Sequence, residues 1–300
     1  MRLSGIALIV LASMAVTIFA ADPTPVVIPR TEQFDVKSKN GLEYRIFVAA
    51  PTGKAPDAGY PVIYLSDGNG NFPTVHSAAR RLSMNDLSAV VVGIGYPTDE
   101  TKVHNERRSF DLTPPTSAEW LKTLPKGAPI GKTGGSNEFL AFIEGELKPL
   151  IEHKYTIDRK RQTLFGHSFG GLFALHVLFS KPDAFQTYVA SSPSIWWNDR
   201  SVLTEEKAFA EKFAGKAVNA RVLVSVGGWE QQAGVKVSKE RAEMLRDRRM
   251  VDNAKELAAR LEKSAVKGLT VAFREFAEED HGSVVLPAAS RGVRFALESP

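Results

Sequence analysis

The chain has 300 residues, of which 43% are hydrophobic and 24% charged, so its composition excludes a disordered or collagen-like protein. Its net charge is only +4, and the densest basic run, residues 236–249, also carries acidic residues. This mixture is typical of a solvated helix face and argues against a nucleic-acid partner. The absence of cysteine excludes disulfides, thiolate metal sites and a cysteine nucleophile.

The N-terminus has the pattern of an export signal. Arg2 precedes an uncharged, apolar stretch over residues 3–21 that ends in small residues, as secretory signal peptides do. The stretch is just long enough to cross a bilayer, so an uncleaved membrane anchor is the alternative. We expect residues 1–21 to be a signal peptide and residues 22–300 to form a single domain. The mature protein is then expected to be periplasmic or secreted, without stable membrane association.

The first predicted elements form a β-hairpin. Residues 31–38 and 42–50 have the pattern of strands, and Asn40-Gly41 between them is a preferred two-residue hairpin turn. Polar and apolar residues alternate in the second segment, which predicts a half-buried edge strand.

Continuous apolar runs follow the hairpin. Residues 62–65 and 89–94 are short and unbroken by charge, which predicts parallel strands buried on both faces. Residues 76–85 between them favour a helix. Residues 97–137 are rich in proline, glycine, serine and threonine and are expected to form a long functional loop. An amphipathic helix is predicted over 137–155.

The second half of the chain alternates between strand and helix patterns. Such alternation predicts a mostly parallel sheet with helices on both faces, which places the chain in the α/β class. The expected strands cover residues 163–165, 187–190, 221–226 and 270–276, and the expected helices cover 169–180, 205–214, 240–265 and 283–297.

The sharpest chemical signal is the run Gly-His-Ser-Phe-Gly-Gly over residues 166–171. It follows a predicted strand and opens an apolar helix, which is the context of a nucleophile elbow. The serine of such a turn has a strained backbone, and Gly166 and Gly170 leave space around it. Ser168 is therefore the candidate nucleophile.

A serine nucleophile needs a base and an acid, which follow it in that fold in the order serine, acid, histidine. His281, after the last predicted strand, is the histidine at the required place. Glu230 follows the preceding strand and is the candidate acid that orients the imidazole. Asp199 is a weaker rival, and a Ser168–His281 pair with only modest help from an acid is the alternative.

An oxyanion hole needs two aligned N–H donors. One is expected from the backbone of Phe169, directly after the nucleophile. The other is expected from Gly68 or Asn69, in the glycine-rich segment after the strand at 62–65.

Together these motifs resemble the esterase D and enterochelin esterase branch of the α/β hydrolases, in particular its periplasmic esterases of catecholate siderophore trilactones. The resemblance covers about residues 32–297 and implies a metal-independent serine ester hydrolase of α/β-hydrolase fold, without a cofactor, in which Ser168 and His281 react. The matching segments are YLSDGN at 64–69, VVGIGY at 91–96, RSFDLTP at 108–114, GGSNEF at 134–139, GHSFGGL at 166–172 and ASSPS at 190–194.

The resemblance also suggests how substrate is held. Basic residues near the site hold anionic catecholate groups in esterases of this kind, and Arg108, with its neighbour Arg107, is the candidate. The alternative is that Arg108 pairs with Asp111 and braces its loop. Trp196 and Trp197 follow the Ser-Pro-Ser segment and either stack on aromatic acyl groups or belong to the core.

The expected function is that of an exported serine esterase acting through an acyl-enzyme on a small-molecule ester, such as a ferric or apo catecholate siderophore. A general carboxylesterase, a feruloyl-type esterase and an acyltransferase on the same fold are the alternatives. Two further alternatives fit less well. A non-catalytic siderophore-binding protein would be expected to have lost catalytic residues that are present here. A thioester hydrolase of one-carbon metabolism would not be expected to carry an export signal.

Overall fold

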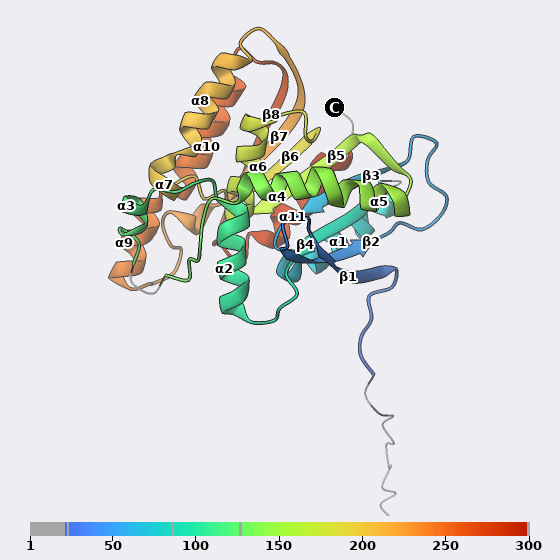
Figure 1. Cartoon of the computed structure of the whole chain (residues 1–300). Helices are drawn as coiled ribbons and strands as arrows, with labels where there is room; N and C mark the ends of the chain where they lie inside the picture. Colours follow the sequence, from blue (N-terminus) through green and yellow to red (C-terminus); the bar gives the residue numbers. More distant parts are fainter. Residues whose placement is uncertain (1–21, 23, 86, 126–127, 299–300) are drawn as a thin grey trace, which may run out of the picture.

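A twisted sheet of eight strands organises the protein (Figure 1). The computed structural model describes residues 22, 24–85, 87–125 and 128–298. The strand order is β1-β2-β4-β3-β5-β6-β7-β8; the β1–β2 and β2–β4 pairs are antiparallel, and the pairs from β4 to β8 are parallel. The strands are β1 (Thr31–Lys37), β2 (Glu43–Ala49), β3 (Tyr60–Leu65), β4 (Val90–Gly95), β5 (Ile157–His167), β6 (Thr187–Ser191), β7 (Ala217–Gly227) and β8 (Lys267–Phe276).

This topology is that of the α/β-hydrolase fold and confirms the predicted fold class, including the N-terminal hairpin. Gly41 has the positive φ of 86° that the hairpin turn requires, which most other residues adopt only at a cost. The prediction that the second strand lies at the sheet edge is wrong. β2 pairs with β4 on its other side, so β1 is the edge strand and Ile46 and Val48 are fully buried.

Helices cover both faces of the sheet (Figure 1). α1 and α11 pack together over one face, and α6, with α8, α10 and the α4–α5 segment, covers the other. The helices are α1 (Gly68–Leu82), α2 (Thr101–Leu112), α3 (Ala118–Leu121), α4 (Ser136–Phe142), α5 (Lys148–Lys154), α6 (Phe169–Ser180), α7 (Trp197–Arg200), α8 (Val202–Lys212), α9 (Lys239–Arg248), α10 (Met250–Glu262) and α11 (Val285–Leu297). The π-helical segment η2 (Ile143–Leu147) joins α4 to α5, and η1 (Ser83–Asn85) and η3 (Gly228–Glu230) are short 3₁₀ turns.

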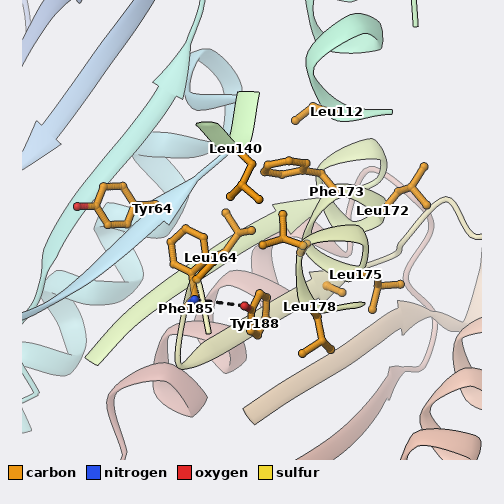
Figure 2. Packing of buried hydrophobic residues seen from close by; sticks show 14 of the residues in the cluster. Tyr64, Leu112, Leu140, Leu164, Leu172, Phe173, Leu175, Leu178, Phe185 and Tyr188 are labelled. Atoms are coloured by element: carbon orange, nitrogen blue, oxygen red, sulfur yellow. Dashed lines mark hydrogen bonds between the residues drawn. The ribbon is translucent and has the colours of Figure 1, made fainter. Parts of the chain in front are cut away.

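Helix α6 is buried from Phe169 to Phe179, which explains its unbroken apolar sequence. Figure 2 shows Phe173 and Leu178 of this helix among the side chains of Leu164, Phe185 and Tyr188. A helix that is apolar all round belongs in the interior of a protein. Because α6 begins directly after the candidate nucleophile, this packing anchors Ser168 to the buried core.

The segment expected as a long loop over residues 97–137 contains two helices, α2 and α3, so that prediction is wrong. α2 is polar in sequence and has no strong apolar stripe. Its order comes from tertiary contacts: Leu112 is fully buried, and the buried carboxylate of Asp111 accepts a hydrogen bond from the Tyr44 hydroxyl at 3.3 Å. Such long-range contacts leave no local pattern for a sequence prediction to use.

Two further element boundaries differ from expectation. α1 begins at Gly68, immediately after β3, and not near residue 76. The predicted long helix over residues 240–265 is broken at Arg249, which has a φ of 47°. The break lets α10 bury its apolar face in the core while α9 follows another direction and buries only Leu245.

The expected signal peptide, residues 1–21, lies outside the described residues. Within the described ranges, every helix is too short or too polar to span a lipid bilayer.

Candidate active site

Ser168 occupies a sharp turn between β5 and α6. Its backbone is strained, with φ 60° and ψ −117°, a combination typical of a nucleophile elbow. Glycine is required on both sides: a Cβ on Gly166 would lie 1.9 Å from the Gly170 carbonyl oxygen, and a Cβ on Gly170 would lie 2.1 Å from Ser66 Oγ. The turn therefore presents the Ser168 side chain at the carboxyl edge of the sheet, with its Oγ 3.5 Å from Ser194 Oγ.

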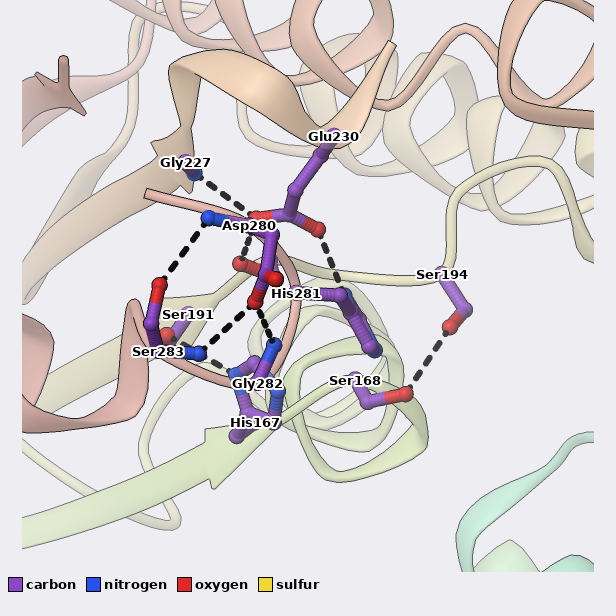
Figure 3. Close-up of polar contacts among 11 residues, drawn as sticks. His167, Ser168, Ser191, Ser194, Gly227, Glu230, Asp280, His281, Gly282 and Ser283 are labelled. Atoms are coloured by element: carbon purple, nitrogen blue, oxygen red, sulfur yellow. Dashed lines mark hydrogen bonds and ion pairs between the residues drawn. The ribbon is translucent and has the colours of Figure 1, made fainter. Parts of the chain in front are cut away.

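Glu230 and His281 meet next to this serine (Figure 3). The short η3 turn after β7 carries Glu230, whose side chain is 1% exposed, and its Oε2 lies 2.5 Å from Nδ1 of His281. The other carboxylate oxygen accepts hydrogen bonds from the Gly227 N–H at 2.7 Å and the Ser192 hydroxyl at 2.5 Å. Figure 3 shows the His281 ring between Glu230 and Ser168. The rival carboxylate, Asp199, lies exposed in α7.

The electrostatics of this arrangement keep Glu230 charged. Burial opposes its ionisation, but the hydrogen bond and charge of His281, together with the Ser192 and Gly227 donors, hold the pKa of Glu230 below its usual range. An ionised carboxylate only accepts hydrogen bonds, so Nδ1 of His281 must carry its proton. In the neutral form of the imidazole, Nε2 is therefore the nitrogen without a proton.

The loop that carries His281 is held by its neighbour Asp280. The Asp280 carboxylate accepts hydrogen bonds from the backbone N–H groups of Gly282 and Ser283, at 2.8 and 2.9 Å (Figure 3). These hydrogen bonds hold the pKa of Asp280 below its usual range, so its carboxylate stays charged at neutral pH. A loop tied in this way presents the imidazole in one orientation.

His167 also lies against His281. The two imidazole rings are 4.7 Å apart between centroids and tilted by 39°. The His167 side chain is buried, and its Nδ1 lies 3.1 Å from Ser191 Oγ. Burial, and then the charge of His281, lower the pKa of His167 to about 4, so it is neutral at pH 7.

This lowered pKa predicts a pH-dependent stability that originates at His167. An unfolded histidine, with a pKa of 6.5, binds a proton at pH 5, but the folded one does not. The stabilisation is therefore complete above about pH 6.5 and is lost as the pH falls towards 4. We expect the free energy of unfolding to be about 2 kcal/mol lower at pH 5 than at pH 7 through this residue, and His167→Asn to remove that difference.

Urea unfolding of both proteins at pH 5 and pH 7 measures the effect. Asparagine at this position keeps a hydrogen-bonding group near Ser191 but does not titrate. An equal loss of stability in both proteins on acidification would show that the pH dependence arises elsewhere.

The expected oxyanion donors lie at two helix N-termini. Phe169 is the first residue of α6 and Gly68 the first of α1, so their N–H groups point out of the helix without an intrahelical acceptor. Phe169 lines the cavity above Ser168. The Asn69 side chain holds the backbone of Tyr96: its amide NH₂ donates a hydrogen bond to the Tyr96 carbonyl, and its amide oxygen accepts one from the Tyr96 N–H. The second donor, from Gly68 or Asn69, remains a prediction.

A cavity of about 360 Å³ opens over these groups. Ser168, Glu230 and His281 line it on one side, and Trp196 and Trp197 line another. Trp197 is fully buried, donates to Thr116 Oγ1 at 2.9 Å and packs edge-on against Phe169, so it serves the core as well as the cavity wall. Trp196 is only partly buried.

A family model described as "Putative esterase" matches residues 38–277 of the chain. The chain belongs to this esterase family. It is 42% identical over 276 residues to the ferri-bacillibactin esterase BesA of Bacillus subtilis, with 90% of each chain covered. It is 38% identical to the siderophore triacetylfusarinine C esterase of Aspergillus fumigatus, over 92% of this chain and 96% of the relative. Among solved structures, the BES protein from Bacillus cereus matches with a TM-score of 0.80 and 38% identity, covering 93% of this chain and 100% of its own.

The two arginines expected to hold substrate in this esterase have other contacts. Arg108 lines the cavity, but its guanidinium makes a two-pronged salt bridge with the buried carboxylate of Asp67, at 2.8 and 3.0 Å, and does not pair with Asp111. Arg107 does not line the cavity. Its guanidinium lies over the Tyr44 ring and donates to the Glu43 carbonyl.

Some contributors to the site of this esterase were not recognised in the sequence. The Ser192 hydroxyl donates a hydrogen bond to Glu230, and the carboxylate of Asp67 forms a salt bridge with Arg108. Both lie in segments that carried the resemblance, but neither has a spacing that reveals its partner. Arg241 and Arg248 of α9 also line the cavity. Their charged run has the sequence pattern of an ordinary solvated helix face, because a helix pattern does not show which neighbour the helix approaches.

Proposed function

We propose that this esterase is an exported serine hydrolase that cleaves an ester bond of a siderophore through an acyl-enzyme. The observation that carries the proposal is the strained Ser168 turn facing the cavity beside the buried Glu230–His281 pair. The activities of its relatives, a ferri-bacillibactin esterase and a triacetylfusarinine C esterase, support the choice of a siderophore ester.

In the proposed reaction, Nε2 of His281 takes the proton of Ser168 as its Oγ attacks the ester carbonyl carbon. The N–H of Phe169 and a second donor, from Gly68 or Asn69, bind the oxyanion that forms. When the tetrahedral intermediate collapses, the carbon–oxygen bond to the alcohol breaks and His281 returns the proton to that oxygen. Glu230 stabilises the transient imidazolium.

Water then completes the cycle. His281 takes a proton from the water as its oxygen attacks the acyl-enzyme carbonyl. The bond to Ser168 Oγ breaks, and the proton returns to that oxygen. The products are a carboxylic acid and an alcohol, and the free enzyme is restored without a metal or cofactor.

We further propose that residues 1–21 direct export and that residues 22–300 form a single domain. The basic residue followed by an apolar stretch supports the first statement. The match of the family across residues 38–277 supports the second. The mass of the N-terminal peptide of the protein recovered after expression in a bacterium distinguishes a cleaved signal from a retained anchor.

The test of function compares two esters. Protein recovered after export is assayed with a catecholate siderophore trilactone and with p-nitrophenyl butyrate. We expect kcat/KM to be at least about 100-fold higher for the trilactone, because the remote parts of the true substrate contribute binding energy that a short acyl chain lacks. Turnover of the short ester alone would indicate a general carboxylesterase. Transfer of the acyl group to an added alcohol in preference to water would indicate an acyltransferase.

A further inference from the structure

Arg108 of α2 connects the two segments that are expected to bind the oxyanion. Its guanidinium donates to both carboxylate oxygens of Asp67, at 2.8 and 3.0 Å, and Asp67 directly precedes Gly68. The carbon of the same guanidinium lies 5.1 Å from the centre of the Phe169 ring. One side chain therefore contacts the first expected donor residue and holds the residue that precedes the second.

Asp67 has a strained backbone at the end of β3. Its φ of 54° and ψ of 42° lie in the left-handed region, which costs energy for a residue with a side chain. An aspartate directly before a helix commonly caps that helix with its own carboxylate. The carboxylate of Asp67 instead turns to Arg108. Strain of this kind persists only where the surrounding structure enforces it, and the contact with α2 supplies that constraint.

The turn after Asp67 fits closely against the rest of the site. A Cβ on Gly68 would lie 2.8 Å from the backbone of β4, so this part of the turn is already in close contact with the sheet. On the other side, a Cβ on Gly170 would lie 3.7 Å from Oδ2 of Asp67, so the carboxylate lies beside the nucleophile elbow. A shift of Asp67 would therefore move the N–H groups of Gly68 and Asn69 relative to the elbow.

The contact between Asp67 and Arg108 joins two charged groups away from water. Their side chains are 9% and 18% exposed. Burial opposes the ionisation of Asp67, but the charge and the hydrogen bonds of Arg108 hold the pKa of Asp67 below its usual range. His104 also lies 4.0 Å from this carboxylate, and burial lowers the pKa of His104, so Arg108 is the main cation facing it at neutral pH. Two-pronged pairs of this kind fix geometry as well as charge.

We propose that Arg108 is a positioning residue, which acts through Asp67 to aim the oxyanion-binding N–H groups of the turn after β3. The inference rests on the proposed function. Donors aimed at the oxyanion stabilise the transition state more than the bound substrate. Loss of Arg108 is therefore expected to lower kcat and to leave KM nearly unchanged.

The kinetic experiment separates this role from direct substrate binding, since Arg108 also lines the cavity. kcat and KM are measured for uncharged p-nitrophenyl butyrate and for the catecholate siderophore trilactone. We expect Arg108→Gln to lower kcat about 30-fold for both esters, with KM within about 3-fold of wild type. Arg108→Lys keeps the charge but not the two-pronged geometry, and should recover at least about 3-fold of the lost kcat.

Two further variants control for stability and for charge. Arg108→Gln alone leaves a buried carboxylate without its partner, which destabilises a protein. The double variant Asp67→Asn/Arg108→Gln removes both charges, and asparagine tolerates the left-handed backbone. Its kcat should equal that of Arg108→Gln within about 3-fold, because the two residues act through one contact. Lys102→Gln removes an exposed cation from the same helix and should leave kcat within about 2-fold of wild type.

A trifluoromethyl ketone tests the oxyanion site without turnover. In the expected complex, Ser168 Oγ bonds to the carbonyl carbon, the π electron pair moves to the carbonyl oxygen, and the Ser168 proton passes to Nε2 of His281. ¹⁹F NMR measures the Kd of this hemiketal in each variant, and urea unfolding gives the folded fraction. We expect the affinity to fall by about the same factor as kcat/KM, because the ketone mimics the tetrahedral intermediate.

Three results would overturn the positioning role. One is a loss confined to the KM of the trilactone, because Arg108 would then contact the substrate itself. Another is a double variant that is folded and keeps the kcat and the ketone affinity of wild type. The third is a fall in kcat without a matching fall in ketone affinity, which would indicate a purely structural effect.

Failure of the proposed function has a different signature. A wild-type protein that binds the ketone but does not prefer the trilactone would refute the siderophore substrate, while the ketone affinities of the Arg108 variants would still decide the positioning role. A wild-type protein that does not form the hemiketal would refute both, because Ser168 would then generate no oxyanion.

Discussion

Ser168→Ala is expected to lower kcat for ester hydrolysis by a factor of at least about 10⁴, because no other group can form the acyl-enzyme. Its stability should change little. Among the described residues, the Oγ makes only a 3.5 Å hydrogen-bond contact, with Ser194, and alanine keeps the same strained backbone at φ 60°. Steady-state hydrolysis and urea unfolding of the same preparation measure both quantities.

Ser194→Ala is the matched control for this change. It removes a hydroxyl from the same cavity, 3.5 Å from the nucleophile, but leaves Ser168, His281 and Glu230 in place. We expect a loss of less than about 10-fold, because Ser194 neither accepts nor transfers a proton in the proposed reaction. Retention of most of the activity in Ser168→Ala would place the nucleophile elsewhere and refute the proposed mechanism.

Glu230→Gln is expected to reduce kcat by a factor of about 10³ to 10⁴, as loss of the acid does in related catalytic triads. Glutamine has nearly the same shape but a single acceptor oxygen. The two carboxylate oxygens of Glu230 accept hydrogen bonds from His281, Ser192 and Gly227. In glutamine an NH₂ group, which is itself a donor, replaces one of these oxygens and must then face at least one of the three donors. If the amide faces His281, the imidazole takes the wrong tautomer and Nε2 no longer serves as the base.

A neighbouring carboxylate provides the control for Glu230. Glu278→Gln removes an exposed carboxylate three residues before His281 and should leave kcat within about 2-fold of wild type. A loss of less than about 10-fold in Glu230→Gln would mean that Ser168 and His281 work as a pair with only modest help from the acid. In that case the buried Glu230 serves mainly to hold the η3 turn against Ser192.

The candidate catalytic residues were recognisable in the sequence because each follows a strand. The elbow at Ser168 has a local signature, since the strained turn demands small residues at Gly166 and Gly170. His281 and Glu230 were found from their order along the chain, and parallel strands bring the ends of such segments to the same edge of the sheet. The structure places Glu230, and not Asp199, beside His281.

The substrate-binding residues were less accessible to sequence reasoning. Arg108 was expected to be available to substrate, but its guanidinium is occupied by Asp67, which lies 41 residues earlier in the chain. Arg107 was expected beside it, yet successive residues of a helix point in different directions, and Arg107 turns towards Tyr44. Arg241 and Arg248 of α9 line the cavity, and α9 ends at a break at Arg249 that no glycine or proline marks.

The α/β class, the hairpin, the buried strands and the candidate nucleophile, acid and base could all be predicted from the sequence. These features depend on local periodicity and turn chemistry, which involve a few neighbouring residues. The helix α2, the packing of His167 on His281 and the choice of arginines that face the cavity became visible in the folded protein. Those outcomes depend on contacts between residues far apart in the chain, where burial and charge pairing outweigh local preference.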